Sequence, residues 1–461
     1  MTAPPVGTPG RPGRPGRPRQ LQLMGLVAVM FFCVSGGPFG LEGMVGPVGP
    51  GLALLLLVLI PILYTIPEAL LIGELASMLP AEGGYYVWVK RAFGPFWGFW
   101  NGWLSWVYSL VDMALYPVLF RDYLHYFLPG LTPLEGWIVA LSVIWIATGL
   151  NLRGTRTVGA ASTGFVALVV APFAVLAALA AAKWLGDPAA HLSLTPFHAE
   201  GTTFFAALGV GISQGIWNYS GWDNASTIGD EIQSSGRTYP RALARAVPLV
   251  TLVYLVSVVP TLAVSDWHMW TDGAWPAIAR AIVGGWLAQW IALAGMVSAF
   301  ALFNALLLAY SRIPLALARD GLLPQALGGT DERGTPRTAV IVSAIIYSVW
   351  VLLPFGDLLA ADVLLYTLAL MLEFGALLAL RRKEPGLRGP FRVPLPTSVL
   401  ALLAALPPLV LGTAVALELT GEGAGFKGVL VGLTLAAVGP VIYAVLIRRA
   451  PRAARGEAAA P

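Results

Sequence analysis

The stretch VSGGPFGLEG, residues 34–43, interrupts a long apolar segment near the start of the chain with glycines, a proline and a glutamate. A membrane helix is normally regular, because every backbone polar group in hydrocarbon needs a partner within the protein. Irregular backbone persists at membrane depth only where it is buried in protein or lines a water-filled cavity. The stretch therefore predicts a broken membrane helix beside a cavity.

The rest of the chain has the composition of an integral membrane protein. Of its 461 residues, 57% are hydrophobic and only 11% are charged. Apolar runs recur along it, each long enough to cross a bilayer core of roughly 30 Å. We therefore predict an all-α membrane protein with twelve transmembrane helices, at roughly 21–47, 51–79, 94–127, 134–151, 155–183, 203–229, 243–264, 279–317, 338–354, 357–380, 397–418 and 426–448.

Basic residues are distributed unevenly between the loops on the two sides of these helices. If the N-terminus lies inside, only Arg121, Lys183, Arg280 and Lys427 of the 28 Lys and Arg residues fall outside. Such a bias follows the positive-inside rule and predicts cytoplasmic N- and C-termini in a multi-pass protein of the cell (plasma) membrane. Since topology accounts for the basic residues, the net charge of +4 gives no reason to expect a nucleic-acid partner.

The chain organisation that we predict is one membrane domain between two tails. Residues 1–20 form a disordered basic tail, residues 21–448 a single polytopic membrane domain, and residues 449–461 a short tail. A second interruption, IWNYSGWDN at 216–224, lies in the sixth predicted helix. Breaks in helices one and six predict a 5+5 inverted repeat over about 21–380, with helices eleven and twelve added at about 397–448. No residue-level repeat relates the two halves.

Carboxylates within the predicted spans are the most informative feature. No Lys or Arg lies well inside any span. A carboxylate is costly in hydrocarbon and marks an ion or substrate path, so these groups need protons, metal ions or a cationic substrate as partners. The acids concerned are Glu42, Glu68, Glu74, Asp112, Asp223 and Glu373.

Asp112 has the sequence surroundings of a cation site. Tyr108 and Tyr116 lie four residues before and after it, which places them on the same helix face. A carboxylate between two aromatic rings suits an ammonium group, because it combines charge attraction with cation–π attraction. The alternative is a structural Asp that is hydrogen-bonded to tyrosine.

The two interruptions supply further candidate substrate-binding residues. Asp223 lies in the second one, close to Trp217 and Trp222, and this group also suits an organic cation. The alternative is an aromatic core with a capping Asp. In the first one, Gly36 and Gly37 can turn carbonyl and amide groups toward a ligand, or can simply form a packing kink.

The remaining acids have competing interpretations. Glu42 could line an outer vestibule and contact substrate, whereas Glu68, directly after Pro67, is equally compatible with function and with structure. Glu74 lies near the inner end of helix two, where a structural contact to a loop arginine is favoured. Glu373 could pair with RRK at 381–383 or face inner water. We keep Glu68, Glu74 and Glu373 as candidates for proton coupling or a proton path.

Sequence motifs for other classes of membrane protein are missing. The four histidines fall in predicted outer segments, and the chain contains no H-E-x-x-H, no G-x-x-x-x-G-K-[ST] and no G-x-S-x-G. The single cysteine, Cys33, argues against a cysteine-based metal cluster. We therefore expect no enzyme activity, no cofactor and no metal site; the coupling ion could be a proton, with sodium still open.

Three motifs in order resemble the amino acid–polyamine–organocation superfamily of transporters. GELASMLPAEGGYYVWVKRAFGPFWGFWNGW at 73–103 resembles its helix-two to helix-three signature. GDEIQSSGRTYPRAL at 229–243 resembles the loop after helix six, with a serine near 235 in place of a proline. SRIPLALARDGLLP at 311–324 resembles the loop after helix eight. The resemblance covers residues 21–448 and implies a LeuT-like fold.

Within that superfamily the chain looks most like the polyamine-uptake branch of plants and protists. VSGGPFGLE, IPEALLIGEL, DMALYPVLFRDYL and WDNASTIGDE carry this similarity, whereas most amino-acid members have G-[ST]-G-[IV] at the first break. The resemblance implies that Glu42, Glu68, Asp112 and Asp223 are matching acids. It also implies that Trp217 covers the bound substrate, and that putrescine or spermidine is transported.

The sequence therefore predicts a permease that imports organic cations by alternating access. Its partners would be a small organic cation, or an amino acid, and the lipid bilayer; the oligomeric state is left open. The first alternative is an amino acid permease, in which the amides of helix one hold a carboxylate. The second is a non-transporting sensor, which the short C-terminal tail argues against.

Overall fold

The computed structural model describes residues 22–80, 84–153, 162–226, 232–331, 334–420 and 425–449. All regular elements in these ranges are helices. The predicted tail at 1–20 and nearly all of the one at 449–461 lie outside the described residues. The same is true of 81–83, 154–161 and 227–231, which fall on two of the quoted motifs and on the ends of two predicted helices.

The described residues of the first half of the chain form ten helices, whose order and bounds are as follows. They are α1 (Leu23–Val34), α2 (Glu42–Val48), α3 (Pro50–Ile60), the π-helical turn η1 (Pro61–Thr65), α4 (Ile66–Met78), α5 (Gly84–Phe93), α6 (Pro95–Leu124), α7 (Pro133–Leu152), α8 (Ser162–Gly186) and α9 (Phe204–Tyr219). The η1 turn joins α3 and α4 into one element with the length and hydropathy of a membrane span.

The second half contains the remaining helices in the described ranges. They are α10 (Ser235–Ala263), the short turn η4 (Trp267–Met269), α11 (Trp275–Ile282), α12 (Gly285–Tyr310), α13 (Arg312–Arg319), the turn η5 (Gln325–Gly328), α14 (Arg337–Trp350), α15 (Phe355–Lys383), α16 (Thr397–Thr420) and α17 (Phe426–Arg449). The short helix α5 lies outside the predicted spans, whereas α13 and the end of α11 fall within the eighth predicted span, which the structure divides into separate helices.

Nine helices in the described ranges are long and apolar enough to cross a membrane. They coincide with nine of the twelve predicted spans. The other three predictions fall on shorter helices: α1 and α2 for the first, α9 for the sixth and α14 for the ninth. A multi-pass helical membrane protein is therefore confirmed, whereas the count of twelve, the inverted repeat and the LeuT-like fold stay predictions.

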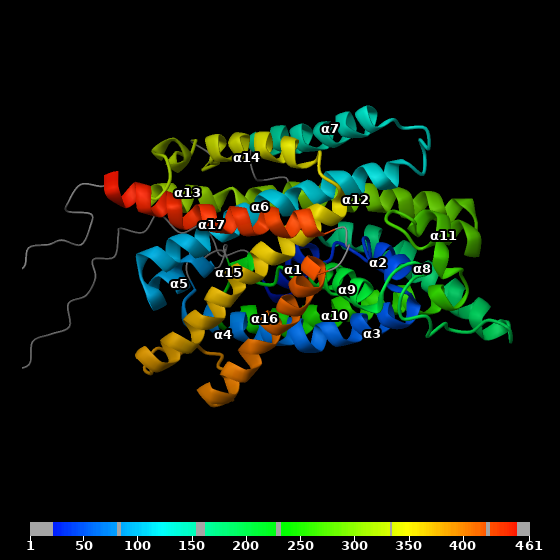
Figure 1. The fold of residues 1–461 in the computed structure, drawn as a ribbon, viewed down its shortest axis with the longest axis horizontal. Coiled ribbons are helices and arrows are strands. Elements are labelled where there is room, and N and C mark those ends of the chain that lie inside the picture. Colours follow the sequence, from blue (N-terminus) through cyan, green and yellow to red (C-terminus); the bar gives the residue numbers. More distant parts are fainter. Residues whose placement is uncertain are drawn as a thin grey trace, which may run out of the picture.

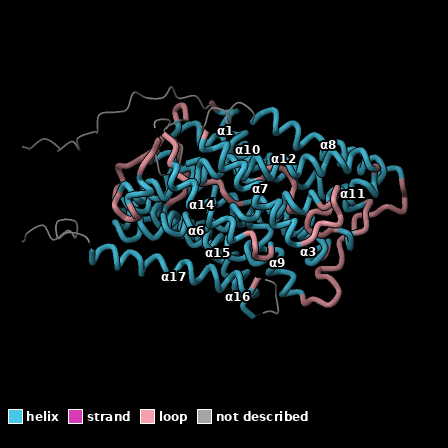
Figure 2. The backbone as a smooth tube through the Cα atoms, turned by 90° about the horizontal axis from the view of Figure 1, so that it is seen from above, coloured by secondary structure: helices cyan, strands magenta, loops and turns pink. Residues whose placement is uncertain are grey.

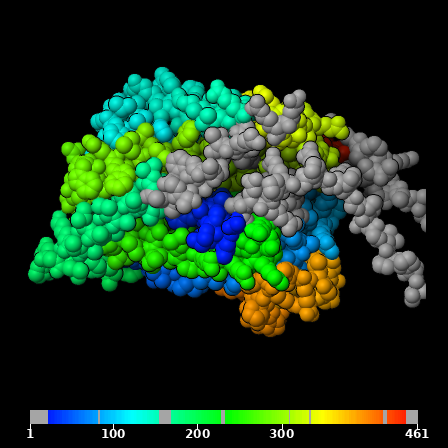
Figure 3. All heavy atoms as spheres, turned by 180° about the vertical axis from the view of Figure 1, so that it is seen from behind, coloured from blue at the N-terminus to red at the C-terminus, as the bar shows by residue number. Residues whose placement is uncertain are grey.

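The long helices run broadly along the longest axis of the molecule (Figures 1 and 2). Helices α7 and α14 lie side by side along one edge and pack against α6 (Figure 1). Helix α6 also packs against α12 and α15, so it lies at the centre of the bundle. Helices α5 and α13 lie toward one end of the bundle, and α2 and α11 toward the other (Figure 1). Helix α1, in blue, reaches the surface beside α10 in the opposite view (Figure 3).

Both predicted interruptions are present. Helix α1 ends at Val34 and α2 begins at Glu42, so the first break spans 35–41. Helix α9 ends at Tyr219, and the described chain up to Ser226 continues only as short turns. The first break depends on glycine: Gly36 has a φ of 56° and Gly40 a φ of 88°, and such positive values strain other residues.

Candidate functional site

A cavity lies where the two interruptions meet the central helices. Its walls come from the end of α1, the turn after α9, and helices α6, α12 and α15. The described residues lining it include carboxylates and hydroxyls but no Lys, Arg or His side chain. The polar and aromatic members are Ser35, Phe39, Tyr108, Asp112, Tyr116, Tyr123, Trp217, Asn218, Ser220, Asn224, Ser298, Tyr310, Asp362 and Tyr366.

Asp112 is held in this wall by three donors from three helices. The Tyr116 hydroxyl faces both carboxylate oxygens at 3.1 and 3.2 Å, one turn further along α6. The Tyr310 hydroxyl donates to Oδ2 at 3.1 Å, and the Trp217 indole N–H donates to Oδ1 at 3.3 Å. These donors hold the Asp112 carboxyl group in the cavity wall, where a cationic group could contact it.

Tyr108, the other tyrosine predicted beside Asp112, lines the same cavity. Its hydroxyl donates to Asn224 Oδ1 at 2.8 Å, and the Asn224 amide donates to the Tyr310 hydroxyl at 3.2 Å. Its ring meets that of Tyr366 edge-on, with the ring centres 5.2 Å apart. Tyr108, Asp112, Tyr116 and Trp217 are thus brought together as the sequence predicted; whether they bind substrate stays a prediction.

Aromatic side chains close the cavity toward α2 and α11. Phe39, in the first break, packs edge-on against Tyr123 and Phe173, with ring centres 5.1 and 5.0 Å apart. The Trp275 indole donates to the Pro38 carbonyl at 2.8 Å, which fixes the break against α11. Proline is favoured at the first position of a helix, yet Pro38 lies before α2, which begins at Glu42.

Glu42 is part of this closure and is not among the residues that line the cavity. It is fully buried, and its Oε2 accepts the Gly40 backbone N–H at 2.8 Å. Its Oε1 accepts the Gly273 backbone N–H at 3.1 Å and the Tyr123 hydroxyl. Glu42 therefore joins α2 to α6 and to the loop before α11, a placement that differs from the expected outer vestibule.

The predicted glycines and Trp222 are engaged within the protein. The Ser298 hydroxyl donates to the Gly36 carbonyl, and the Ser35 hydroxyl bonds both the carbonyl and the amide of Gly37. The Trp222 indole donates to a backbone carbonyl, and its side chain is fully buried outside the cavity wall. In this arrangement the three residues support the two interruptions.

Asp223 and Glu68 form a second acidic group next to the cavity. The Tyr366 hydroxyl lies 2.5 Å from Glu68 Oε1 and 2.8 Å from Asp223 Oδ1. All three side chains are buried, as is Glu373 on α15, which acts electrostatically with Asp223 and Glu68. Tyr366 also lines the cavity, so it connects this group to the wall that carries Asp112.

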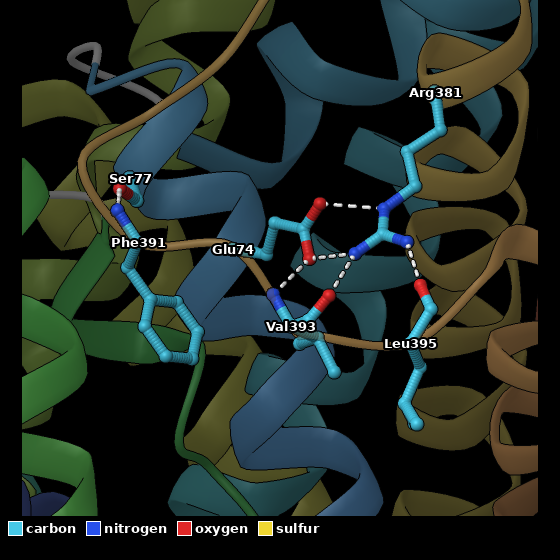
Figure 4. Close-up of polar contacts among 6 residues, drawn as sticks. All are labelled: Glu74, Ser77, Arg381, Phe391, Val393 and Leu395. Carbon is cyan, nitrogen blue, oxygen red and sulfur yellow. Dashed lines mark hydrogen bonds and ion pairs between the residues drawn. The ribbon is translucent and has the colours of Figure 1, made fainter.

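Glu74 lies apart from both acidic groups and forms a buried ion pair with Arg381 (Figure 4). Its Oε1 accepts from Arg381 Nε at 2.6 Å, while Oε2 accepts from the guanidinium and, at 2.8 Å, from the Val393 amide. Arg381 also donates to the carbonyls of Val393 and Leu395 (Figure 4). The partner of Glu74 is thus Arg381 of α15. The sequence analysis had considered this arginine as a partner of Glu373.

Comparison with known proteins identifies the family of this chain. A family model described as amino acid permease matches residues 25–423. The chain belongs to the amino acid permease family. It is 36% identical over 393 residues to a probable polyamine transporter of Arabidopsis thaliana, covering 84% of this chain and 80% of that protein.

Two further relatives match more of the permease. A polyamine transporter of Oryza sativa subsp. japonica is 34% identical over 426 residues, which cover 91% of this chain and 77% of that protein. A polyamine transporter of Arabidopsis thaliana is 33% identical over 426 residues, with coverages of 91% and 84%. The resemblance inferred from the motifs is confirmed, and the relatives support transport over catalysis.

The structure adds residues to the cavity of the permease that the sequence analysis missed. Asp362 on α15 lines the wall, is buried, and has no hydrogen-bond partner on Oδ1 among the described atoms. The sequence did contain a signal for Asp362. The residue lies inside a predicted span, and Tyr366 follows it after four residues, just as Tyr116 follows Asp112. Tyr310, from α12, carried no such local signal.

One titratable group outside the membrane helices lies close to the closure. Asp272, in the loop before α11, is an exposed residue, but its carboxylate packs against Gly43. Desolvation and the nearby Asp122 carboxylate raise the pKa of Asp272 to about 6. Among the described residues of the permease, no group of three or more His, Cys, Asp or Glu side chains could hold a metal ion.

Proposed function

We propose that this permease imports polyamines, or organic cations of the putrescine and spermidine type, across the cell membrane by alternating access. The observation that carries the proposal is the cavity wall itself. It presents the Asp112 and Asp362 carboxylates and several tyrosine rings, with no basic side chain among the described lining residues. An ammonium group fits such a wall through charge and cation–π attraction, and the names of the relatives point the same way.

In this proposal one amine of the substrate lies at Asp112, between Tyr108 and Tyr116. The second amine of a diamine reaches Asp362, and Trp217 covers the bound molecule. The bundle then opens toward the cytoplasm, which we place on the side of the basic loops. A membrane potential that is negative inside favours entry by about 2.3 kcal/mol per charge per 100 mV.

The arrangement of twelve helices as two inverted five-helix halves plus two helices belongs to the same proposal. The two interruptions support it, because they meet at one cavity as discontinuous helices do in transporters built this way.

A competition experiment tests the substrate class. Labelled putrescine is bound to purified permease in detergent and is challenged with spermidine, arginine, lysine and a neutral amino acid. We expect spermidine to displace putrescine and the neutral amino acid to leave it bound. Binding of the neutral amino acid, with no binding of putrescine, would overturn the proposal in favour of an amino acid substrate.

A further inference from the structure

The hydroxyl of Tyr366 makes more contacts with acids than one hydroxyl proton can supply. It lies 2.5 Å from Glu68 Oε1 on α4 and 2.8 Å from Asp223 Oδ1 in the turn after α9. It also accepts the backbone N–H of Gly221 at 2.9 Å. Three polar groups, one from α4 and two from the turn after α9, therefore converge on one oxygen atom of α15.

Counting hydrogens shows what this geometry requires. A hydroxyl has one proton to donate and two lone pairs that accept. The Gly221 amide occupies one lone pair, and the Tyr366 proton can satisfy only one of the two carboxylates. The other carboxyl fits at hydrogen-bond distance only if it carries a proton of its own and donates it to the remaining lone pair.

Glu68 is the better candidate for the protonated member. Its side chain is fully buried, and its second oxygen, Oε2, has no hydrogen-bond partner among the described atoms. An ionised carboxylate with an unpaired oxygen would pay a large desolvation cost, whereas the carbonyl oxygen of a neutral acid pays little. The unpaired oxygen is a second observation, independent of the contacts around Tyr366.

No cation from the described residues neutralises the pair. None of the described Lys, Arg or His side chains acts on Glu68, Asp223 or Glu373. The other titratable groups that face the pair are neutral or acidic and come from each element packed around it. They are Cys33 on α1, Tyr64 on η1, Tyr85 on α5, Tyr108 on α6, Tyr239 on α10 and Glu373 on α15.

We propose that Glu68 and Asp223 bind one exchangeable proton, bridged by Tyr366, and that transport moves this proton. Tyr366 lines the cavity and also bonds both acids. Loss of the shared proton would weaken these bonds, which hold α15 against the second interruption, and would therefore be felt in the cavity wall. When the site opens to water, the carboxylic O–H bond of Glu68 breaks, the proton passes to water, and a carboxylate remains. The link to transport rests on the proposed polyamine function; the proton site itself does not.

The first test needs no substrate. Infrared spectra of purified permease at neutral pH report the carbonyl stretch of protonated carboxylic acids. We expect Glu68→Gln to remove one such band, and Tyr366→Phe to shift it. Glu418→Gln is the matched comparison, because Glu418 on α16 is also buried with one unpaired oxygen but bonds Ser213 instead of Tyr366. Any band that Glu418→Gln removes should therefore be one that Tyr366→Phe does not shift. Identical spectra for the wild type and Glu68→Gln would overturn the proton site.

The second test follows protons during transport. Proteoliposomes containing a trapped pH dye receive putrescine while the membrane potential is clamped at zero. We expect proton movement with the wild type and with Glu418→Gln, and loss of this movement with Glu68→Gln, which still exchanges labelled putrescine for unlabelled. Proton movement that persists in Glu68→Gln, or that is absent from a transporting wild type, would overturn the coupling.

The two tests separate the failure of this inference from the failure of the proposed function. A wild type that shows the Glu68 band but transports no putrescine would leave the proton site standing and would remove the polyamine proposal. If putrescine or sodium abolished the infrared band of Glu68 without any proton movement, the pair would bind a cation other than an exchangeable proton. The inference would then be wrong.

Discussion

At the scale of single residues, Asp112 differs from the other buried acids in how its oxygens are satisfied. Tyr116, Tyr310 and Trp217 all donate to it, so its charge is stabilised before any substrate arrives. Glu68 and Asp223 instead share one tyrosine hydroxyl. The acids therefore differ in their surroundings: Asp112 accepts hydrogen bonds from three side chains, whereas Glu68 and Asp223 share one hydroxyl group.

Substitution of Asp112 tests its place in substrate binding. Asp112→Asn keeps the shape of the side chain but removes the negative charge that faces an ammonium group. A hydrogen bond to a charged group contributes about 1.5–3 kcal/mol, so we expect putrescine to bind roughly 10- to 100-fold more weakly. Equilibrium binding of labelled putrescine measures this, with Tyr116→Phe as a milder comparison. Unchanged affinity in Asp112→Asn would remove this residue from the site.

Asp272 gives a pH dependence whose sign can be derived. Desolvation and Asp122 raise its pKa to about 6 in the folded protein, from an ordinary value of 3.8. The folded state therefore binds this proton more tightly than the unfolded state, and stability falls as the pH rises through this window. We expect the apparent Tm of the wild type to fall from about pH 4 to pH 6, and Asp272→Asn to reduce that fall.

The control for this titration is Asp266, which is exposed in the same outer segment and bonds His268. Backbone and side-chain hydrogen bonds from His268 lower the pKa of Asp266, so Asp266→Asn should keep the decline of the wild type above pH 4. An equal loss of the decline in both variants would contradict the assignment to Asp272.

The candidate site was predictable where its residues share a helix face. Tyr108, Asp112 and Tyr116 follow a four-residue spacing that places them together without any tertiary information. Contacts between helices carried no such signal: Tyr310 and Asp112 are 198 positions apart. An arginine contact was favoured for Glu74, but its partner, Arg381 of α15, could not be identified from the sequence, because RRK at 381–383 had been considered for Glu373.

At the scale of elements, the first interruption depends on close approach of backbone to side chains. A Cβ atom on Gly40 would lie 2.7 Å from the Trp217 ring, and its φ of 88° already disfavours any other residue. We expect Gly40→Ala to impair putrescine transport and to lower stability by about 1–2 kcal/mol, the usual cost of a strained positive φ. Uptake and thermal unfolding of the purified variant measure both effects.

Gly149 on α7 provides the matched control for Gly40. Nothing lies within 4 Å of a Cβ added there, and the residue is within a helix. Because alanine favours helix by about 1 kcal/mol over glycine, Gly149→Ala should keep transport and keep or raise stability. If Gly40→Ala behaved like Gly149→Ala, the first interruption would not need its observed backbone.

The buried pair Glu74–Arg381 ties α4 and α15 to the segment before α16 (Figure 4). Glu74→Gln leaves the guanidinium buried without its counter-charge, and we expect a loss of about 3–5 kcal/mol in stability. Arg91→Gln removes an exposed pair with Glu384 and should cost at most about 1 kcal/mol. Thermal unfolding of both variants compares them, and similar Tm values would show that the buried pair is not a structural clamp.

The positions of the helices were predictable where a long hydrophobic run alone determines them. Nine long helices coincide with predicted spans, and the first interruption falls within VSGGPFGLEG. The start of α2 was misplaced, because Pro38 suits a first helical turn but its carbonyl instead accepts from Trp275. The η1 turn and the short helices α5, α11 and α13 follow from packing, which leaves little trace in hydropathy.

At the scale of the whole molecule, the cavity is closed on the side of α2 and α11 by residues from several helices. Phe39, Tyr123 and Phe173 form an aromatic layer, and Glu42 joins α2 to the loop before α11. Entry of a substrate from that side requires these contacts to separate. The first interruption, which carries Phe39 and is followed directly by Glu42, is therefore the element expected to move.

Alternating access of an organic cation is the central claim, and uptake into proteoliposomes tests it most directly. Purified permease is reconstituted, and labelled putrescine uptake is measured with and without a membrane potential that is negative inside. The proposal predicts saturable uptake that is blocked by spermidine, increased by the potential, and lost when Asp112→Asn and Asp362→Asn are combined. Absence of putrescine uptake, in liposomes that do exchange arginine or a neutral amino acid, would contradict it.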